Sequence, residues 1–324
     1  MKAVLCKEYG PPQSLVIEDI PSPTPGPRQV LIKIEAAGVN FPDTLIIQNK
    51  YQFKPPLPFT PGGECAGVIT ALGQGVTGFH VGQAVIAFTG WGAFAEELTV
   101  DIARLLPAPS GLPFDIAASF VMAYGTSYHA LTDRAALLPG ETLLVLGAAG
   151  GVGLAAVEIG KSLGARVIAA ASSAQKLAVC QAHGADELIN YTTEDLRDRL
   201  KVLTGGRGVD VVYDPVGGSY SEMALRSMAW RGRFLVVGFA NGQIPSIALN
   251  LALLKGCSIV GVFWGDFTRR EPDKSERNLS ELMRLLQLGK LKPLVSAKYR
   301  LDQIAQALDA VIERQVTGKI VVNP

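Results

Sequence analysis

The stretch Thr142–Gly153, TLLVLGAAGGVG, decides the fold of this chain of 324 residues. It begins with the apolar run Leu143–Leu146, which is typical of a strand that is buried on both faces of a parallel sheet. Small residues follow, and apolar residues then recur at helical spacing as far as Leu163. The pattern predicts a strand at 143–147, a tight turn and a helix at 151–164.

Small residues at such a turn let the backbone approach a phosphate closely, and the N–H groups of the helix's first turn favour its negative charge. The stretch is a variant of the dinucleotide fingerprint, with Ala148 in the place of its first glycine. The residues that we expect to contact a pyrophosphate are Ala149, Gly150, Gly151 and Val152. The stretch alone is not decisive, because any tight turn from strand to helix favours glycine.

Composition limits the classes of protein. The length predicts two domains, and 48% apolar against 18% charged residues is enough for a large core. The net charge is +1 without a basic cluster, which argues against a nucleic-acid partner. The apolar runs are too short to span a bilayer, and no secretory signal is evident at the N-terminus. Four widely spaced cysteines indicate reduced thiols, so we expect a cytoplasmic protein.

The N-terminal third of the chain and the part that follows differ in their pattern of secondary structure. Residues 1–120 read as short strands between proline and glycine turns, which suits a small barrel. From about residue 123 strands and helices alternate, which predicts a doubly wound parallel α/β sheet. The strands expected after the first are 166–170, 187–190, 209–214, 234–238 and 258–263, and the helices are 173–183, 194–203 and 218–229. A charged loop, two helices at 276–288 and 301–314, and a last strand at 319–322 follow.

The end of the strand at 166–170 indicates which dinucleotide binds. A site for NAD usually has an acidic residue there, about 20 residues beyond the glycines, to bind the ribose 2′-hydroxyl. This chain has Ser172 and Ser173 instead, and Lys176 three residues on. An ammonium and two hydroxyls favour the 2′-phosphate of NADPH. The alternative is that a serine only caps the next helix and Lys176 faces solvent, although capping and phosphate binding are compatible.

Several ordered motifs give the chain a family resemblance over essentially its full length. They are GVNFPDTLIIQNKY at 38–51, PFTPGGECAGVI at 58–69, AAGGVG at 148–153, SAQKLAVCQAHGAD at 173–186, INYTTEDL at 189–196 and VVYDPVGG at 211–218. The chain resembles a zinc-free medium-chain dehydrogenase/reductase of the NADPH:quinone oxidoreductase (ζ-crystallin-like) branch. The resemblance implies a GroES-like β-barrel catalytic domain at 1–123 and 264–324, a Rossmann domain at 124–263, a cleft between them and a homodimer.

The resemblance also implies contacts with the cofactor. Lys176 and Ser173 match the positions at the 2′-phosphate, and Tyr191 the position beside the adenine, although Tyr191 also fits a half-buried aromatic at a strand end. Thr126 matches a position near the nicotinamide and pyrophosphate. Phe239 and Phe263 follow strand ends where the nicotinamide is expected, while aromatic residues there often belong to the core. Arg314 or Lys319 resembles a basic residue near the 2′-phosphate, and the sequence does not distinguish them.

The segments that supply zinc ligands in related enzymes read Val39-Asn40-Phe41 and Gly62-Gly63-Glu64-Cys65 here. Zinc needs three or four converging ligands, and the three histidines are scattered. We therefore expect no metal.

Candidate catalytic residues lie between positions 40 and 51. Asn40 can donate a hydrogen bond to an acceptor oxygen and Asp43 can order the loop, or the two form an Asx turn around Pro42. Tyr51 matches the tyrosine that is the proposed proton donor in related enoyl-thioester reductases, or it lines the pocket with its ring only. Position 46, an aromatic residue in some quinone reductases, is Ile46, which leaves quinone stacking open.

The sequence as a whole predicts a metal-free NADPH-dependent oxidoreductase that transfers a hydride to a quinone or another α,β-unsaturated carbonyl. One alternative is a 2-enoyl thioester reductase with Tyr51 as proton donor, which Lys50 and Lys54 favour as a basic rim. Another is an NADPH-binding structural or regulatory protein without turnover. The physiological acceptor and the assembly state stay open.

Overall fold

Residues 1–324 are described by the computed structural model, in which the chain divides into two units. Unit 1 contains Met1–Met122 and Pro293–Pro324, and unit 2 contains Ala123–Lys292. The chain crosses from one unit to the other twice, at residues 122–123 and 292–293. No helix is both long and apolar enough to cross a bilayer.

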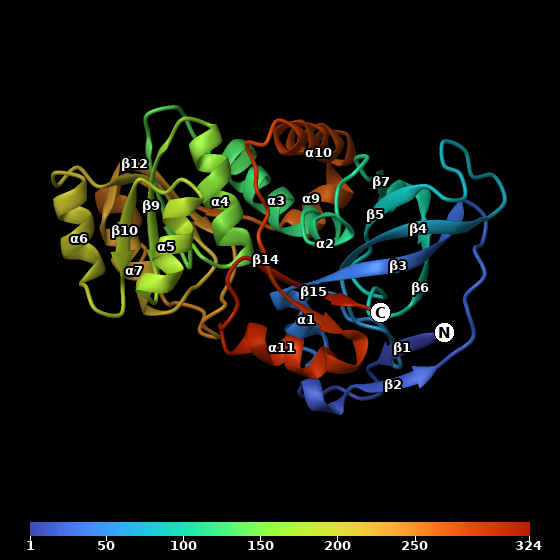
Figure 1. The fold of residues 1–324 in the computed structure, drawn as a ribbon. Coiled ribbons are helices and arrows are strands. Elements are labelled where there is room, and N and C mark those ends of the chain that lie inside the picture. The colour runs from blue at the N-terminus through green and yellow to red at the C-terminus, as the bar shows by residue number, and fades with distance from the viewer. The chain divides into compact units, whose positions relative to one another are not determined.

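Unit 2 contains a parallel sheet of six strands in the order β10-β9-β8-β11-β12-β13 (Figure 1). Each pair of neighbouring strands is parallel. The strands run in sequence from β8 to β10 on one side of β8 and from β11 to β13 on the other, so the strand order reverses between β8 and β11, as in a dinucleotide-binding sheet. The strands are β8 (Thr142–Leu146), β9 (Arg166–Ala171), β10 (Glu187–Asn190), β11 (Val209–Asp214), β12 (Met228–Val236) and β13 (Ser258–Gly261). The predicted doubly wound sheet is therefore confirmed.

Helices cover this sheet because their apolar faces need burial. The helix α4 (Gly151–Ser162) packs on β8 and β9, and Gly160 allows a close approach, since a Cβ there would lie 2.6 Å from the Leu143 side chain. The other helices of the unit are α5 (Ala174–Ala182), α6 (Leu196–Leu203), α7 (Ser219–Arg226), α8 (Asn250–Lys255), α9 (Trp264–Arg270), α10 (Pro272–Gln287) and the π-helix η3 (His129–Arg134). The helix α3 (Val121–Tyr128) starts in unit 1 and continues into unit 2.

Unit 1 is built on a mixed sheet in the order β14-β15-β3-β4-β5-β7, with β6 also paired to β3. All of its pairs are antiparallel except β14 with β15. The strands are β3 (Gln29–Val39), β4 (Glu64–Leu72), β5 (Ala84–Phe88), β6 (Glu97–Asp101), β7 (Leu105–Pro107), β14 (Val295–Arg300) and β15 (Lys319–Asn323). Figure 1 shows β15, in red, beside the blue β3, so the last strand completes the sheet of the first.

Smaller elements surround this sheet. They are the paired strands β1 (Lys2–Leu5) and β2 (Val16–Asp19), the helices α1 (Phe41–Ile46), α2 (Phe114–Ala118) and α11 (Ile304–Ile312), and the short 3-10 turns η1 (Pro12–Ser14), η2 (Ile102–Arg104) and η4 (Leu301–Gln303). The helix α11 packs on α1 and β15, so its apolar residues join the core of unit 1.

The segment 264–292 lies in unit 2, whereas the sequence analysis assigns it to the barrel domain. Two contacts explain the difference: Phe267 of α9 stacks on His129 with ring centroids 3.8 Å apart, and Asn278 of α10 donates a hydrogen bond to Asp133. Both partners belong to η3 of unit 2, so both helices are held there. The expected charged loop is instead the helix α9 and the start of α10, which Pro272 begins.

Candidate cofactor site and catalytic cluster

The turn after β8 exposes the N-terminus of α4. Gly147 has φ +57°, a left-handed conformation that favours glycine, and Gly150 caps α4 without any side-chain hydrogen bond. The first-turn N–H groups of a helix have no partner within the helix. In α4 these groups belong to Gly151, Val152 and Gly153, and no capping side chain takes them. The 12-residue helix α4 therefore offers an anion both the free N–H groups of its first turn and the positive end of its helix dipole.

Gly153 holds this turn tight. A Cβ at Gly153 would lie 2.3 Å from the carbonyl oxygen of Gly147, so no side chain fits there without moving the backbone. Ala148 is buried and donates its N–H to the carbonyl of Ala170, which fixes the turn to β9. The alanine that replaces the fingerprint glycine at position 148 is therefore packed inside the turn. Ala149, one of the residues expected to contact the pyrophosphate, is 2% exposed.

Ser172, Ser173 and Lys176 come together where β9 ends. The hydroxyl of Ser173 accepts a hydrogen bond from the N–H of Lys176 at 3.3 Å, which caps α5. The ammonium of Lys176 lies 3.4 Å from the hydroxyl of Ser172, to which it donates. The helix cap by a serine, the alternative expected from the sequence, is therefore present, and the ammonium of Lys176 also reaches the hydroxyl of Ser172.

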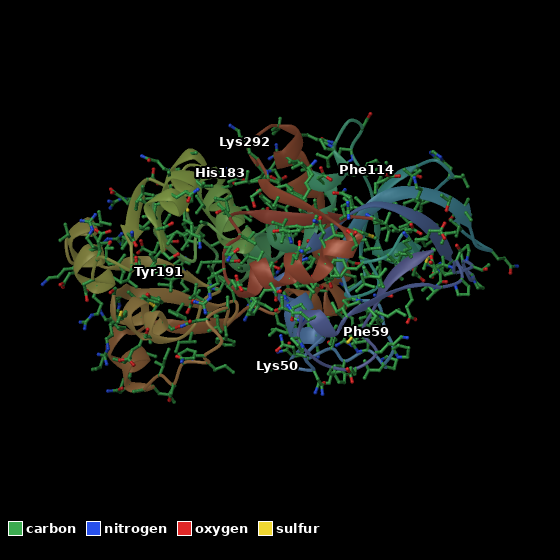
Figure 2. The ribbon with its side chains drawn as sticks, turned by 60° about the horizontal axis from the view of Figure 1, so that its bottom comes forward. Lys50, Phe59, Phe114, His183, Tyr191 and Lys292 are labelled. Atoms are coloured by element: carbon green, nitrogen blue, oxygen red, sulfur yellow. The ribbon has the colours of Figure 1, made fainter.

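Tyr191 lies beside these serines because β10 pairs with β9. Its N–H donates to the carbonyl of Ala171, and its ring is tilted against that of Tyr220 with centroids 4.5 Å apart. Figure 2 labels Tyr191 in unit 2. A half-buried aromatic face at the end of β10 suits stacking against a planar base.

The remaining predicted cofactor residues of unit 2 are spread along its strand ends and α3. Phe239 follows β12, and Phe263 follows β13, where it is 45% exposed at the start of α9. Thr126 is a half-buried residue of α3. The loop after β11 lies beside Phe239, since a Cβ at Gly217 would be 3.0 Å from that ring. Phe239 and Phe263 therefore follow the carboxyl ends of neighbouring strands, where doubly wound sheets bind ligands.

Asn40 and Asp43 of unit 1 begin the helix α1 together. The N–H of Asn40 donates to the carboxylate of Asp43 at 2.8 Å, and the N–H of Asp43 to the carbonyl of Asn40 at 3.0 Å. Asp43 is 3% exposed, and this burial raises the pKa of its carboxyl from 3.8 to about 7 despite the hydrogen bond from Asn40 and the charge of Lys319. Asp43 therefore changes charge near neutral pH.

The side chain of Asn40 is committed to protein groups. Its amide nitrogen donates to Glu64 at 3.0 Å and to the carbonyl of Gly38 at 3.3 Å, and its oxygen accepts from Lys319 at 2.5 Å. An Asn amide has two donor hydrogens, so neither is left for an acceptor oxygen. The structure therefore does not support Asn40 as a direct hydrogen-bond donor to a substrate.

Lys319 lies in a buried cluster with Asn40 and Glu64. From the sequence, Lys319 is instead expected at the 2′-phosphate of the cofactor. Lys319 is 7% exposed, and its ammonium donates to Asn40, to the carbonyl of Val39 at 2.9 Å and to Glu64 at 3.1 Å. An ammonium has three hydrogens, and these partners take all of them. The register of β15 against β3 brings Lys319 here from 279 residues away, which no local pattern reveals. Arg314, the alternative, is exposed just after α11.

Glu64 connects the cluster and was not singled out in the sequence. Its carboxylate is fully buried, and besides Lys319 and Asn40 it accepts the N–H of Met122 at 3.0 Å. A carboxylate flanked by Gly63, Cys65 and Ala66 in an otherwise small, apolar segment is the sequence signal that marks a buried charge with a partner.

Tyr51 packs against the core of unit 1 and meets Phe53 edge-on with centroids 5.9 Å apart. Burial, and secondarily the charge of Asp43, raises the pKa of its phenol, so the hydroxyl stays protonated at neutral pH. Lys50 and Lys54 are exposed next to it, and Figure 2 labels Lys50. Ile46 is 3% exposed, so it belongs to the core and offers no stacking face.

Two family models match this chain. Residues 26–110 match the alcohol dehydrogenase GroES-like domain, and residues 151–284 match the zinc-binding dehydrogenase model. The quinone oxidoreductase-like protein 2 homolog of Nematostella vectensis is 40% identical over 99% of this chain and 88% of its own length. The chain belongs to the quinone oxidoreductase family of the medium-chain dehydrogenases/reductases.

Solved structures agree with this family. The quinone oxidoreductase from Thermus thermophilus, which was also determined in complex with NADPH, superposes with a TM-score of 0.87 at 34% identity and covers 100% of both chains. The CurK enoyl reductase superposes with a TM-score of 0.90 at 27% identity, over 99% of this chain and 98% of that one. Although one family model is named for zinc, no group of three or more His, Cys, Asp or Glu side chains in this structure is placed to hold a metal ion.

Proposed function

We propose that this chain is an NADPH-dependent oxidoreductase. The proposal depends on the uncapped N-terminus of α4, and on Lys176 in the same unit. The ammonium of Lys176 donates to the hydroxyl of Ser172, where an NAD site has a carboxylate. NADPH supplies a hydride when it is bound.

The donor set of unit 2 fits each part of that cofactor. The first turn of α4, with Ala149 to Val152, would hold the pyrophosphate. Lys176 with Ser172 and Ser173 would hold the 2′-phosphate, and Tyr191 would lie along the adenine. Thr126, Phe239 and Phe263 would border the nicotinamide half. Relatives determined with NADPH support this assignment.

We propose that the reaction is metal-free. The place from which related enzymes offer zinc ligands is taken by Asn40, and the ammonium of Lys319 donates to it and to Glu64. A buried ammonium within hydrogen-bond distance of both possible oxygen ligands repels a second cation. The donor set therefore fits a hydrogen-bonded network better than a zinc site.

The acceptor that suits this chemistry is a quinone or another α,β-unsaturated carbonyl. Reduction of such a group adds one hydride and one proton, and the proton comes from water or from a side chain. With Asn40 committed to other groups, the neutral hydroxyl of Tyr51 is the remaining candidate donor in the cluster.

A second candidate, reduction of a 2-enoyl thioester, is favoured by the position of Tyr51 beside the charge of Asp43. A carboxyl that titrates near neutrality can return a proton to the phenol after each turnover. The exposed Lys50 and Lys54 would suit the phosphates of a long thioester carrier.

Steady-state oxidation of NADPH separates these candidates. The acceptors to compare are 1,4-benzoquinone, 9,10-phenanthrenequinone, a 2-alkenal and crotonyl-CoA, each with the wild type and with Tyr51→Phe. The proposal expects turnover with a quinone or the alkenal. Turnover with crotonyl-CoA alone, abolished in Tyr51→Phe, would establish the second candidate, and no turnover despite NADPH binding would indicate a protein that binds without catalysis.

We also propose that the protein forms a homodimer through β13. This strand is the outer edge of the sheet in unit 2, and its backbone has one free side. Leu253 and Leu254 of α8 and Trp230 of β12 are each at least 70% exposed. Exposed edges and apolar patches are normally covered in soluble proteins, and a two-fold axis would pair β13 with its own copy.

A further inference from the structure

Three residues form a buried chain of hydrogen bonds behind the first turn of α4. The hydroxyl of Ser127, on α3, donates to the carbonyl oxygen of Val152 at 2.8 Å. The hydroxyl of Tyr213, on β11, lies 2.8 Å from the same serine oxygen. Both side chains are fully buried, so water does not compete for these bonds. None of the roles assigned above uses Ser127 or Tyr213.

The direction of each hydrogen bond in this series is fixed. A serine hydroxyl has one hydrogen, and Ser127 directs it to Val152, so the hydrogen between Ser127 and Tyr213 comes from the tyrosine. Burial raises the pKa of Tyr213, which keeps that hydrogen in place at all ordinary pH values. Two successive donations therefore end on the carbonyl of Val152.

The carbonyl of Val152 and the N–H of Gly153 belong to one peptide group. A hydrogen bond accepted by the carbonyl polarises the group and strengthens the N–H as a donor. Gly153 contributes one of the first-turn N–H groups of α4, and its backbone is held tightly against the carbonyl of Gly147. The hydrogen bonds from Tyr213 through Ser127 thus strengthen the N–H of Gly153, which belongs to the anion site.

We infer that Ser127 and Tyr213 are positioning residues for the pyrophosphate of the dinucleotide, acting through the Val152–Gly153 peptide. The inference rests on the proposed function, because it assumes that α4 binds a pyrophosphate. Ser127 and Tyr213 should contribute to the binding of both NADPH and NADH, because both carry a pyrophosphate. Lys176 should contribute to the binding of NADPH alone, because only NADPH carries the 2′-phosphate.

The test is equilibrium binding by calorimetry with Tyr213→Phe and Ser127→Ala. Tyr213→Phe loses one neutral buried hydrogen bond and Ser127→Ala loses two. We expect the Kd for NADPH and for NADH to rise together by about three- to tenfold in each variant. Adenosine 2′-monophosphate has no pyrophosphate, so its Kd should stay as in the wild type. In steady state the KM for NADPH should rise while the KM for the acceptor and kcat stay unchanged.

Tyr124→Phe is the matched control. The hydroxyl of Tyr124 donates to the buried carboxylate of Glu158 at 2.7 Å in the same unit, so its loss costs a buried tyrosine hydrogen bond at least as strong as those tested, outside the first turn of α4. Figure 2 labels His183 and Lys292, the other partners of Glu158. We expect this control to bind both dinucleotides as the wild type does.

The inference is overturned if both test variants bind NADPH and NADH with wild-type Kd, or if Tyr124→Phe or adenosine 2′-monophosphate shows the same loss. A wild-type protein that binds neither dinucleotide would instead overturn the proposed function itself. Ser127→Ala removes the donor to Val152 directly while the ring of Tyr213 stays in place, so agreement between the two variants separates the hydrogen bonds from a packing change at the tyrosine.

Discussion

Lys176 is the residue that we expect to select the phosphorylated cofactor. Lys176→Ala should weaken NADPH binding by about 1–3 kcal/mol, the range for losing a charge-assisted hydrogen bond, and leave NADH binding nearly unchanged. Calorimetric titration with both cofactors measures the two effects.

Lys201→Ala is the control for that variant, because it removes an equal charge from an exposed place on α6 of the same unit. Equal losses for NADPH and NADH in Lys176→Ala would contradict the assignment to the 2′-phosphate, and a similar loss in the control would indicate a general effect of charge.

Asp43 should make stability depend on pH between about 4 and 7. Its pKa is raised from 3.8 to about 7 by burial, so the folded protein binds this proton more tightly than the unfolded chain does. The stabilisation is complete below the unfolded pKa and is lost as the pH rises through the folded value. We expect the free energy of unfolding of the wild type, relative to Asp43→Asn, to fall by roughly 1–4 kcal/mol across this range.

Urea unfolding at intervals of pH measures this difference, and subtraction of the Asp43→Asn curve removes the other titrating groups. A difference that rises with pH would mean that the hydrogen bonds from Asn40 and Gly63 outweigh burial.

Among the helices, the π-helix η3 is held to α10 by one carboxylate, that of Asp133. Asp133 pairs with His129 at 2.7 Å, accepts from Asn278 at 2.7 Å and lies 3.1 Å from Lys274. Burial alone would raise the pKa of Asp133, but these hydrogen bonds lower it below its usual range. One side chain therefore links the segments 129–134 and 272–287, which are far apart in the sequence.

Asp133→Ala should destabilise the protein by about 2–4 kcal/mol, since it leaves buried donors without their acceptor. Asp302→Ala removes an exposed carboxylate paired with Arg300 and should leave the free energy of unfolding nearly unchanged, because solvent screens an exposed pair. Thermal or urea unfolding of the two variants measures the difference, and equal costs would show that the buried pairing contributes nothing special.

The regular elements of unit 2 are the part that was predictable from sequence. The strands 187–190 and 209–214 have the bounds that were predicted, because apolar runs and glycine turns are local signals. The helix α9 and the strand β14 were missed, since 264–270 is charged and 295–300 alternates weakly. Long-range contacts such as that of Phe267 with His129 decide such segments.

At the scale of the whole molecule, β13 should govern the assembly state. Ile259 is an exposed apolar residue of that strand, and Ile259→Glu would place two like charges at a two-fold contact. We expect the wild type to have twice the chain mass in sedimentation equilibrium, and Ile259→Glu to be shifted toward the monomer. Val202→Glu, an equally apolar exposed site on α6, should leave the mass unchanged.

The division of the chain follows from contacts that only folding makes. The sequence predicts a barrel domain and a Rossmann domain, and both sheets are present, but the segment 264–292 packs with unit 2 through α9 and α10. A boundary depends on which surfaces bury each other, and residue type alone does not carry that information.

The dinucleotide turn and the missing carboxylate after β9 could be determined from the order of residues, because each depends on neighbours within about 20 positions. The family could be determined too, because its motifs are each short and follow one another in order along the chain. The catalytic cluster could not. Lys319 was expected at a phosphate, whereas its strand pairs with β3 and brings its ammonium to Asn40 and Glu64. Strand register over hundreds of residues sets those partners, and it changes Asn40 from a substrate donor into a fixed part of a buried network.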